Sequence, residues 1–340
     1  MSEYKTYLLG ENDIDFWNEY VDRSANGTIY HRYEWLKIAE DHTGMRFLPV
    51  AVNKGNALVC LIPLFHQKKY GFRIVLSPPN ACAIPHLGPV FIIPSTNRYN
   101  YEKTYIEIFD VVIRFVEQKL GFDYIRIIHN PDIVDLRPYI WKKFSIKPNY
   151  TYIFDLSKSS EEIFDNFHKT TKTAIRRAQK YSSIFLSNDQ KYIIDILSMV
   201  NKRYKEQNRI FKITENYINQ LLDSTLSGNI EATAIVHNGS IIAGSIDLVD
   251  KVNMYGWIGS VKREENISGA GEYLLWININ EYQKRGYLTY DIVGANTKHL
   301  YNHKAKYGAR LVQYFVVSKS SGKGKMALEL MKLFGKANND

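Results

Sequence analysis

The spacing of hydrophobic and polar positions switches along the chain between the periods of strands and of helices. Two apolar runs within residues 45–69 flank an Asn-Lys-Gly-Asn turn, which predicts a β-hairpin. Helical stretches precede this hairpin. The elements expected after it are a strand at 72–79, a Pro- and Gly-containing loop at 80–89, a helix at 101–120 and a buried strand at 123–130.

The second half of the chain repeats this order. Helical stretches at 161–226 precede a hairpin at 232–249, whose Asn238-Gly239 pair is a strong tight-turn signal. A strand at 253–259, a glycine-containing loop, a helix at 272–286 and a strand at 288–294 complete the repeat. The pattern therefore predicts two copies of one α/β unit.

The boundary between the two copies is expected near residue 150, where Pro148 interrupts the pattern and a new strand begins. This gives a first domain at 1–149, a second at 150–318 and a tail at 319–340. Within the tail, residues 324–335 are expected to form a helix that must dock on the fold, because it has an apolar stripe. The stripe consists of Ala327, Leu330, Met331 and Phe334.

Composition limits the classes of partner and compartment. A hydrophobic content of 45% over 340 residues excludes wholesale disorder, and a formal charge of +9 favours anionic partners. Nucleotides, tRNA, sugar phosphates and an acidic membrane surface all fit this charge. The two cysteines lack metal-binding spacing, and the sequence shows neither a signal-peptide pattern nor an apolar run of membrane-spanning length. A cytoplasmic protein without a transmembrane segment is expected.

The stretch NISGAGEYLLW, residues 266–276, places two glycines directly before a helix-like run. Glycine readily adopts the positive φ angles of a flexible turn, which is one explanation. A glycine-lined helix N-terminus also directs free N–H groups toward a bound phosphate, which is the other.

Several segments, in their order along the chain, carry a family resemblance. In the second half they are FHKTTKTAIRRAQKY at 167–181, the 266–276 loop, GYLTYDIVGAN at 286–296 and HKAKYGARLVQYF at 303–315. Segments 27–44, 58–65 and 76–91 agree in the first half. Together they resemble the FemAB-like branch of the GNAT acyltransferase superfamily, whose members carry two tandem GNAT-like domains.

This resemblance implies an α/β fold of mixed sheets flanked by helices, with the tail helix docked on the first domain. It also implies transfer of an acyl or aminoacyl group from an activated donor to an amine, on a small-molecule, sugar-nucleotide or cell-envelope precursor acceptor. The donor would be acyl-CoA or aminoacyl-tRNA, and no cofactor would be bound permanently. Asn266, Gly269 and Gly271 take the places of the superfamily's pyrophosphate loop, where Asn266 departs from the usual Arg or Gln.

Lys304 matches the lysine of the family's Lys-x-x-(Phe/Tyr)-Gly element, which Tyr307 and Gly308 complete. Its ammonium would stabilise the developing oxyanion of acyl transfer; the alternative is a solvated surface lysine. Asp291 ends a strand, where it could orient or deprotonate the acceptor amine, or serve only as a cap or ion-pair partner.

The remaining candidate residues would bind substrate. Lys169, Lys172, Arg176 and Lys180 form one basic helix face beside Arg177, and the resemblance associates an arginine of this region with a sugar-nucleotide phosphate. A solvated charged face is the alternative. Trp35 matches a family tryptophan near the acceptor site, although Ala39 stands where wall-precursor enzymes often have lysine. His299 and His303 lack a third ligand, so no metal site is predicted.

Two hypotheses follow from these residues. The first is an N-acyltransferase in which an amine attacks the bound donor directly. The second is a non-catalytic RNA- or phosphate-binding protein that retains the fold, for which the basic helix and the net charge would suffice.

Overall fold

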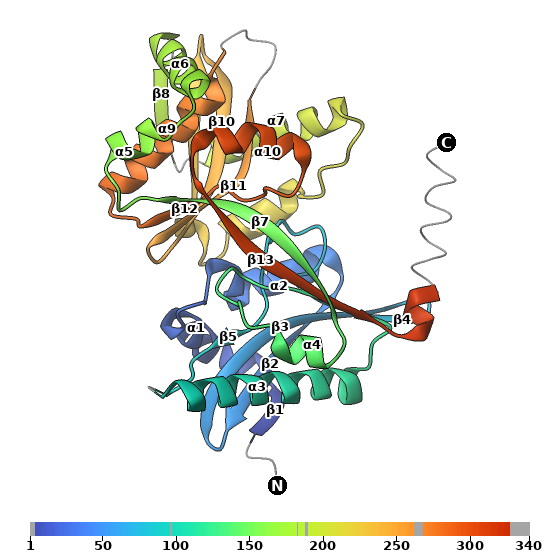
Figure 1. Cartoon of the computed structure of the whole chain (residues 1–340). Helices are drawn as coiled ribbons and strands as arrows, with labels where there is room; N and C mark the ends of the chain where they lie inside the picture. The colour runs from blue at the N-terminus through green and yellow to red at the C-terminus, as the bar shows by residue number, and fades with distance from the viewer. Residues whose placement is uncertain (1–3, 96, 182, 188–189, 262–267, 327–340) are drawn as a thin grey trace. The chain divides into compact units, whose positions relative to one another are not determined.

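The computed structural model describes residues 4–95, 97–181, 183–187, 190–261 and 268–326 (Figure 1). The chain forms two compact units: residues 1–148 with the segment from Tyr314 onward, and residues 149–313. Residues 314–318 thus group with the first unit, whereas the sequence pattern assigned them to the second domain. The reason is strand pairing, because residues 316–320 pair with residues 124–128 of the first unit.

The first unit is a mixed sheet with helices on both faces. Its strands follow the order β1-β2-β3-β4-β6-β13, and β5 pairs with β3. The strands are β1 (Tyr4–Leu8), β2 (Arg46–Lys54), β3 (Ala57–Lys69), β4 (Phe72–Ser77), β5 (Val90–Phe91), β6 (Tyr124–Ile128) and the second part of β13 (Arg310–Ser320). The helices are α1 (Ile14–Arg23), α2 (Tyr33–Thr43), α3 (Arg98–Phe115) and α4 (Arg137–Trp141).

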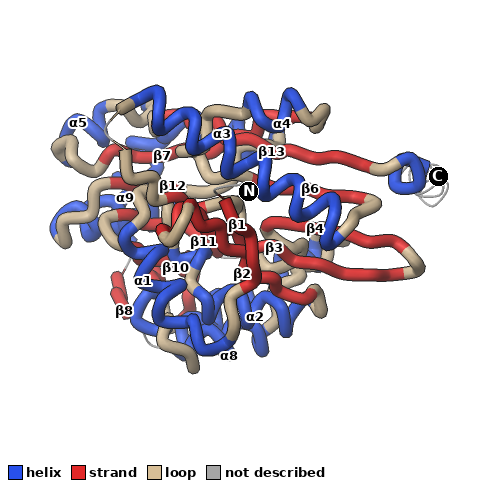
Figure 2. Tube along the Cα trace, turned by 90° about the horizontal axis from the view of Figure 1, so that it is seen from below, coloured by secondary structure: helices blue, strands red, loops and turns tan. Residues whose placement is uncertain are grey.

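Alternation along β2 explains how this sheet is covered on both faces. Leu48 belongs to the core cluster that includes α3, whereas the neighbouring Phe47 packs its ring against Trp17 of α1 and Tyr33 of α2. Figure 2 shows α3 on one side of β1 and β2, with α1 and α2 on the other. The strand is therefore apolar at consecutive positions because both of its faces are buried.

The second unit repeats this arrangement. Its strands follow the order β7-β12-β11-β10-β9-β8. The strands are β7 (Ser145–Asp155), β8 (Ser183–Ser187), β9 (Ile230–His237), β10 (Ser240–Asp250), β11 (Asn253–Val261) and β12 (Thr289–Asp291). The helices are α5 (Ser160–Asp165), α6 (Lys169–Ala178), α7 (Gln190–Glu206), α8 (Glu215–Leu222), α9 (Ala270–Lys284) and α10 (Lys298–Lys304).

Two adjacent residues of β10 show which helices cover which face of this sheet. A Cβ on Gly244 would lie 2.4 Å from the Ile196 side chain of α7, so glycine is needed for this helix to approach. The next residue, Ser245, accepts a hydrogen bond at 2.9 Å from Asn278 of α9. Because successive strand residues point to opposite faces, α7 and α9 lie on opposite sides of the sheet.

The predicted fold class, two tandem units of mixed sheet flanked by helices, is confirmed. Within the segment 161–226, which the sequence pattern assigned to helices, the structure also contains the strand β8. This strand pairs antiparallel with β9 and extends the sheet by its backbone hydrogen bonds. Pairing with a partner 45 to 53 positions away is not encoded in local periodicity.

The predicted tail helix lies largely outside the described residues, which end at Met326. The residues just before the predicted helix contact the first unit. Ser321 donates to the Asp123 carboxylate at 3.1 Å, and the ammonium of Lys323 donates to the Gly71 carbonyl at 3.0 Å.

Candidate active site

The second unit contains two neighbouring parallel strands that separate at their carboxyl ends. Strand β11 pairs with β12 only over residues 253–255 and 289–291, and β12 then stops while β11 continues to Val261. A bulge at Trp257 accompanies the separation, because Ile258 pairs with Ile246 and Gly256 pairs with Asp247. In open α/β sheets, ligands bind in the crevice outside such carboxyl ends.

A buried polar network supports this point of separation. Asp247 accepts hydrogen bonds from the Tyr290 hydroxyl at 2.7 Å, the Ser245 hydroxyl at 2.7 Å and the Asn278 amide at 3.0 Å. Burial raises the pKa of Asp247 to about 6. The Gly256 backbone fits closely over the network, since an added Cβ would lie 3.1 Å from the Tyr290 hydroxyl. The network thereby links β10, β11, β12 and α9.

Asp291 is the last residue of β12, and its carboxylate is buried. One carboxylate oxygen accepts from the Thr151 hydroxyl of β7 at 2.5 Å and from the Val293 N–H at 2.8 Å. Burial raises the pKa of Asp291 to about 6, although these two hydrogen bonds and the charge of Lys304 act in the opposite direction. The group is therefore ionised at neutral pH but close to its titration range.

Lys304 ends α10 and directs its ammonium at the turn that follows Asp291. It donates to the carbonyl of Ile292 at 2.5 Å and to the carbonyl of Val293. Val293 and Gly294 have φ angles of 33° and 84°, and this left-handed turn presents the two carbonyls on one side. Burial lowers the pKa of Lys304 to about 8, against the opposing effect of the Asp291 charge.

The structure thus brings the two predicted catalytic residues together. A carboxylate with a raised pKa and an ammonium with a lowered pKa interact at the carboxyl end of β12. Pairs of this kind can exchange protons with substrate near neutral pH, and such perturbed groups gather at functional sites. Their catalytic roles remain predictions at this stage.

Tyr307 and Gly308, the last two residues of the Lys-x-x-Tyr-Gly element, make packing contacts. The Tyr307 hydroxyl is 2.7 Å from Nε2 of His303, and its ring is buried against Phe167. Gly308 has a φ of 66°, and a Cβ there would lie 2.4 Å from the Asn166 carbonyl. The element therefore joins the end of α10 to the segment between α5 and α6.

The glycine loop before α9 is only partly described, and Asn266 lies outside the described residues. Gly269 caps the helix with a φ of 98°, and a Cβ there would lie 2.3 Å from the Ala174 carbonyl of α6. A Cβ on Gly271 would lie 3.0 Å from the Val261 side chain. Helix packing alone therefore requires glycine at 269, so replacing that residue cannot isolate a phosphate contact.

The other predicted substrate residues lie in separate places. Arg176 and Arg177 are exposed on α6, and the guanidinium of Arg176 stacks on the Phe164 ring at 5.6 Å. Trp35 is fully buried on α2 in the first unit, 5.3 Å from the ring of Tyr30. A substrate contact by Trp35 remains a prediction.

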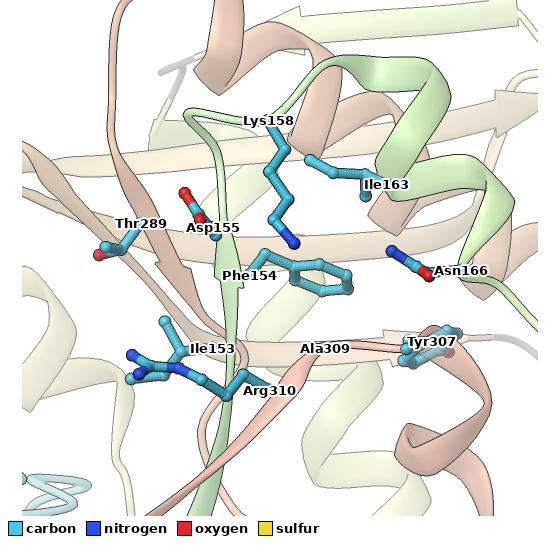
Figure 3. Close-up of a pocket in the computed structure, with 11 residues that line it drawn as sticks. Ile153, Phe154, Asp155, Lys158, Ile163, Asn166, Thr289, Tyr307, Ala309 and Arg310 are labelled. Carbon is cyan, nitrogen blue, oxygen red and sulfur yellow. The ribbon is translucent and has the colours of Figure 1, made fainter.

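A cavity of about 350 Å³ in the second unit is lined largely by residues that the sequence analysis did not select (Figure 3). Asp155, Lys158, Asn166 and Arg310 line it, as does the predicted residue Tyr307. Sequence reasoning also missed Thr151, which bonds Asp291 across 140 positions of sequence. The positions of two of these residues could have drawn attention to them, because Lys158 closely follows the end of strand β7 and Arg310 is the first residue of β13.

Comparisons with known proteins agree with this geometry. Residues 165–305 match the family model described as an acetyltransferase (GNAT) domain. This range includes Lys304, Asp291, the glycine loop and α6. A search of curated proteins returns no match.

Solved structures share the fold over nearly the whole chain. A crystal structure of FemX matches with a TM-score of 0.68 and 11% identity, covering 97% of this chain and 99% of that one. L-PGS from Bacillus licheniformis matches with a TM-score of 0.58 and 12% identity, covering 92% and 95%. A tandem GNAT protein from the clavulanic acid biosynthesis pathway matches with a TM-score of 0.50 and 11% identity, covering 94% and 99%.

These structures confirm the predicted fold of two tandem units. The match to an acetyltransferase (GNAT) domain at residues 165–305 supports an acyltransferase. In the described part of the chain, no helix is both long and apolar enough to cross a membrane. Among the same residues, no three His, Cys, Asp or Glu side chains gather as metal ligands would.

Proposed function

We propose that this protein is an N-acyltransferase that moves an acyl or aminoacyl group from an activated donor to an amine, with Lys304 and Asp291 at its reaction centre. The observation that carries the proposal is their pairing at the carboxyl end of β12, inside the segment that matches an acetyltransferase domain. Fold likeness alone would not specify these residues.

In the proposed reaction, the amine nitrogen attacks the carbonyl carbon of the donor, and a carbon–nitrogen bond forms. The amine proton passes to the Asp291 carboxylate, whose pKa of about 6 lets it accept and then release a proton near neutral pH. The carbon–sulfur bond of an acyl-CoA donor, or the ester bond of an aminoacyl-tRNA, breaks, and the leaving group takes up a proton from solvent. No covalent enzyme intermediate is needed.

Lys304 is suited to stabilising the oxyanion. An ammonium has three donors, and two of them bond the carbonyls of Ile292 and Val293. Held by these bonds, the ammonium can direct its third donor at an oxygen that gains negative charge only in the transition state.

The donor phosphates would lie at the N-terminus of α9, beside Gly269 and Gly271, with α6 packed against it. Acyl-CoA is the donor favoured by the acetyltransferase match, and aminoacyl-tRNA is the alternative donor. For the acceptor, we propose the amine of a small molecule, a sugar nucleotide or a cell-envelope precursor. The exposed Arg176 and Arg177 are proposed contacts for anionic substrate groups.

Lys169, Arg176, Arg177 and Lys180 are all exposed on or just after α6, and this surface favours a second candidate, a non-catalytic RNA- or phosphate-binding protein. Purified protein should be mixed with acetyl-CoA, charged tRNA and a panel of amines, and amide products followed by mass spectrometry. Repeated turnover that is lost in Lys304→Met supports the enzyme. Saturable binding of RNA without product supports the second candidate.

A further inference from the structure

The cavity in the second unit lies where β7 ends and β13 begins. Phe154, Ile163 and Tyr307 give it apolar walls, and its volume of about 350 Å³ is at the lower end of the range for small-molecule sites. Figure 3 shows the Lys158 ammonium and the Asn166 side chain pointing toward each other beside the Phe154 ring. The cavity therefore combines apolar surface with a few convergent polar groups, as ligand sites do.

The charges in this cavity favour an anion. Lys158 and Arg310 line it. Among the described residues neither forms an ion pair within 4 Å, although, after the hydrogen bonds with Ser157, the charges of both contribute to lowering the pKa of Asp155. The single carboxylate in the lining, Asp155, accepts hydrogen bonds from the Ser157 hydroxyl at 2.5 Å and from the Ser157 N–H at 3.1 Å. Two cations against one carboxylate leave one net positive charge, which a ligand with one anionic group would balance.

The cavity borders the two strands that position Asp291. Thr289, in its lining, is two residues before Asp291 on β12, and Ile153 of β7 lies directly opposite Asp291. Since side chains alternate along a strand, Thr289, Ile153 and Asp291 share one face of the sheet. The lining therefore reaches the strand position opposite Asp291, although Asp291 itself does not line the cavity.

The geometry points to the acceptor's own binding site: we propose that this cavity binds an amine that also carries a carboxylate or a phosphate, and that Lys158 and Arg310 hold that anionic group. This inference rests on the proposed function for the identity of the acceptor, but its anion site can be tested without turnover.

The test measures binding of two matched pairs of amines to the full chain by isothermal titration calorimetry, with no donor present. L-alanyl-L-alanine is compared with its C-terminal amide, and glucosamine 6-phosphate with glucosamine, so that carboxylate and phosphate acceptors are distinguished. We expect one anionic member to bind roughly tenfold tighter than its neutral counterpart, as for a charge-assisted hydrogen bond.

Substitutions then assign the effect to the cavity. Lys158→Met and Arg310→Gln should each remove most of the anionic preference. Asp155→Asn should strengthen it severalfold, because it deletes the opposing charge while retaining a carbonyl acceptor for Ser157. Lys284→Met removes an exposed charge at the end of α9 and should leave binding unchanged.

Equal binding within both pairs, no binding of either anionic probe at millimolar concentration, or full affinity in Lys158→Met and Arg310→Gln would each overturn the inference. Weaker anion binding in Asp155→Asn would also overturn it, because Asp155 would then be holding the amine. Failure of the proposed function looks different. In that case the anionic preference and its loss in the variants persist, but acetyl-CoA and charged tRNA yield no amide with any probe.

Discussion

Replacing Lys304 with methionine removes one charge at the proposed reaction centre and keeps an unbranched apolar side chain of similar length. In the wild-type protein the ammonium donates to the carbonyls of Ile292 and Val293 and faces the charge of Asp291. If it also stabilises the oxyanion, the interaction is stronger in the transition state than in the ground state. We therefore expect kcat to fall by roughly a hundredfold or more, as for deletion of an oxyanion donor.

The effect of this substitution on stability is the sum of two opposing terms. Two buried carbonyls lose a donor, at a cost of about 1–3 kcal/mol each. Against this, burial lowers the pKa of Lys304 from 10.5 to about 8, which corresponds to roughly 3 kcal/mol by which folding disfavours the charged form. Methionine carries no charge, so it does not have this desolvation cost. The net change should therefore be a destabilisation of no more than about 3 kcal/mol, which shifts Tm by roughly 10 °C or less.

The assay follows amide formation at saturating donor and amine, together with thermal unfolding of the same preparations. Lys298→Met is the matched control, because it removes an exposed charge at the start of the same helix and should leave kcat and Tm unchanged. An increase in the donor KM with kcat intact would assign Lys304 to donor binding. Unchanged kcat and KM in a folded variant would refute any role for Lys304 in the reaction.

Three further predictions follow from the same unit. At saturating substrates, kcat should rise with an apparent pKa near 6 as Asp291 loses its proton, and it should fall with an apparent pKa near 8 as Lys304 loses its proton. Lys304→Met should abolish the fall, and a pH-independent kcat would contradict the pairing. Gly269→Ala should destabilise the protein by about 2–4 kcal/mol, because alanine is strained at a left-handed φ and its Cβ would collide with α6. Gly271→Ala should destabilise it by less than about 1 kcal/mol. Denaturant unfolding of the two variants tests this, and equal losses of stability would refute it. Asp247→Ala removes the acceptor of the buried Tyr290 hydroxyl and one acceptor each of Ser245 and Asn278. Denaturant unfolding should therefore show a loss of about 2–4 kcal/mol, and a neutral effect would mean that the network contributes nothing.

Local patterns in the sequence predicted most of the repeated order of elements, with strand β8 as an exception. The hairpin at Asn238-Gly239 and the helix that begins after Gly269 depend on side-chain period and turn chemistry, which act over a few residues. The order of these elements, matched to a family pattern, also predicted the tandem fold and selected Asp291 and Lys304. These two lie 13 positions apart, at the end of a strand and of the following helix, so a short segment nearly determines their neighbourhood.

Tertiary structure determined the contacts, pKa shifts and cavity that depend on distant parts of the chain. The hydrogen bond from Thr151 to Asp291 and the contact of Gly269 with Ala174 join segments that sequence periodicity cannot relate. The perturbed pKa values of Asp291 and Lys304 arise from burial, which is a property of the packed unit and not of either residue. The cavity between Lys158 and Arg310 exists only because β7 ends where β13 begins. Local patterns and the family resemblance thus selected Asp291 and Lys304 as candidate residues, whereas long-range packing shifted their pKa values and formed the cavity.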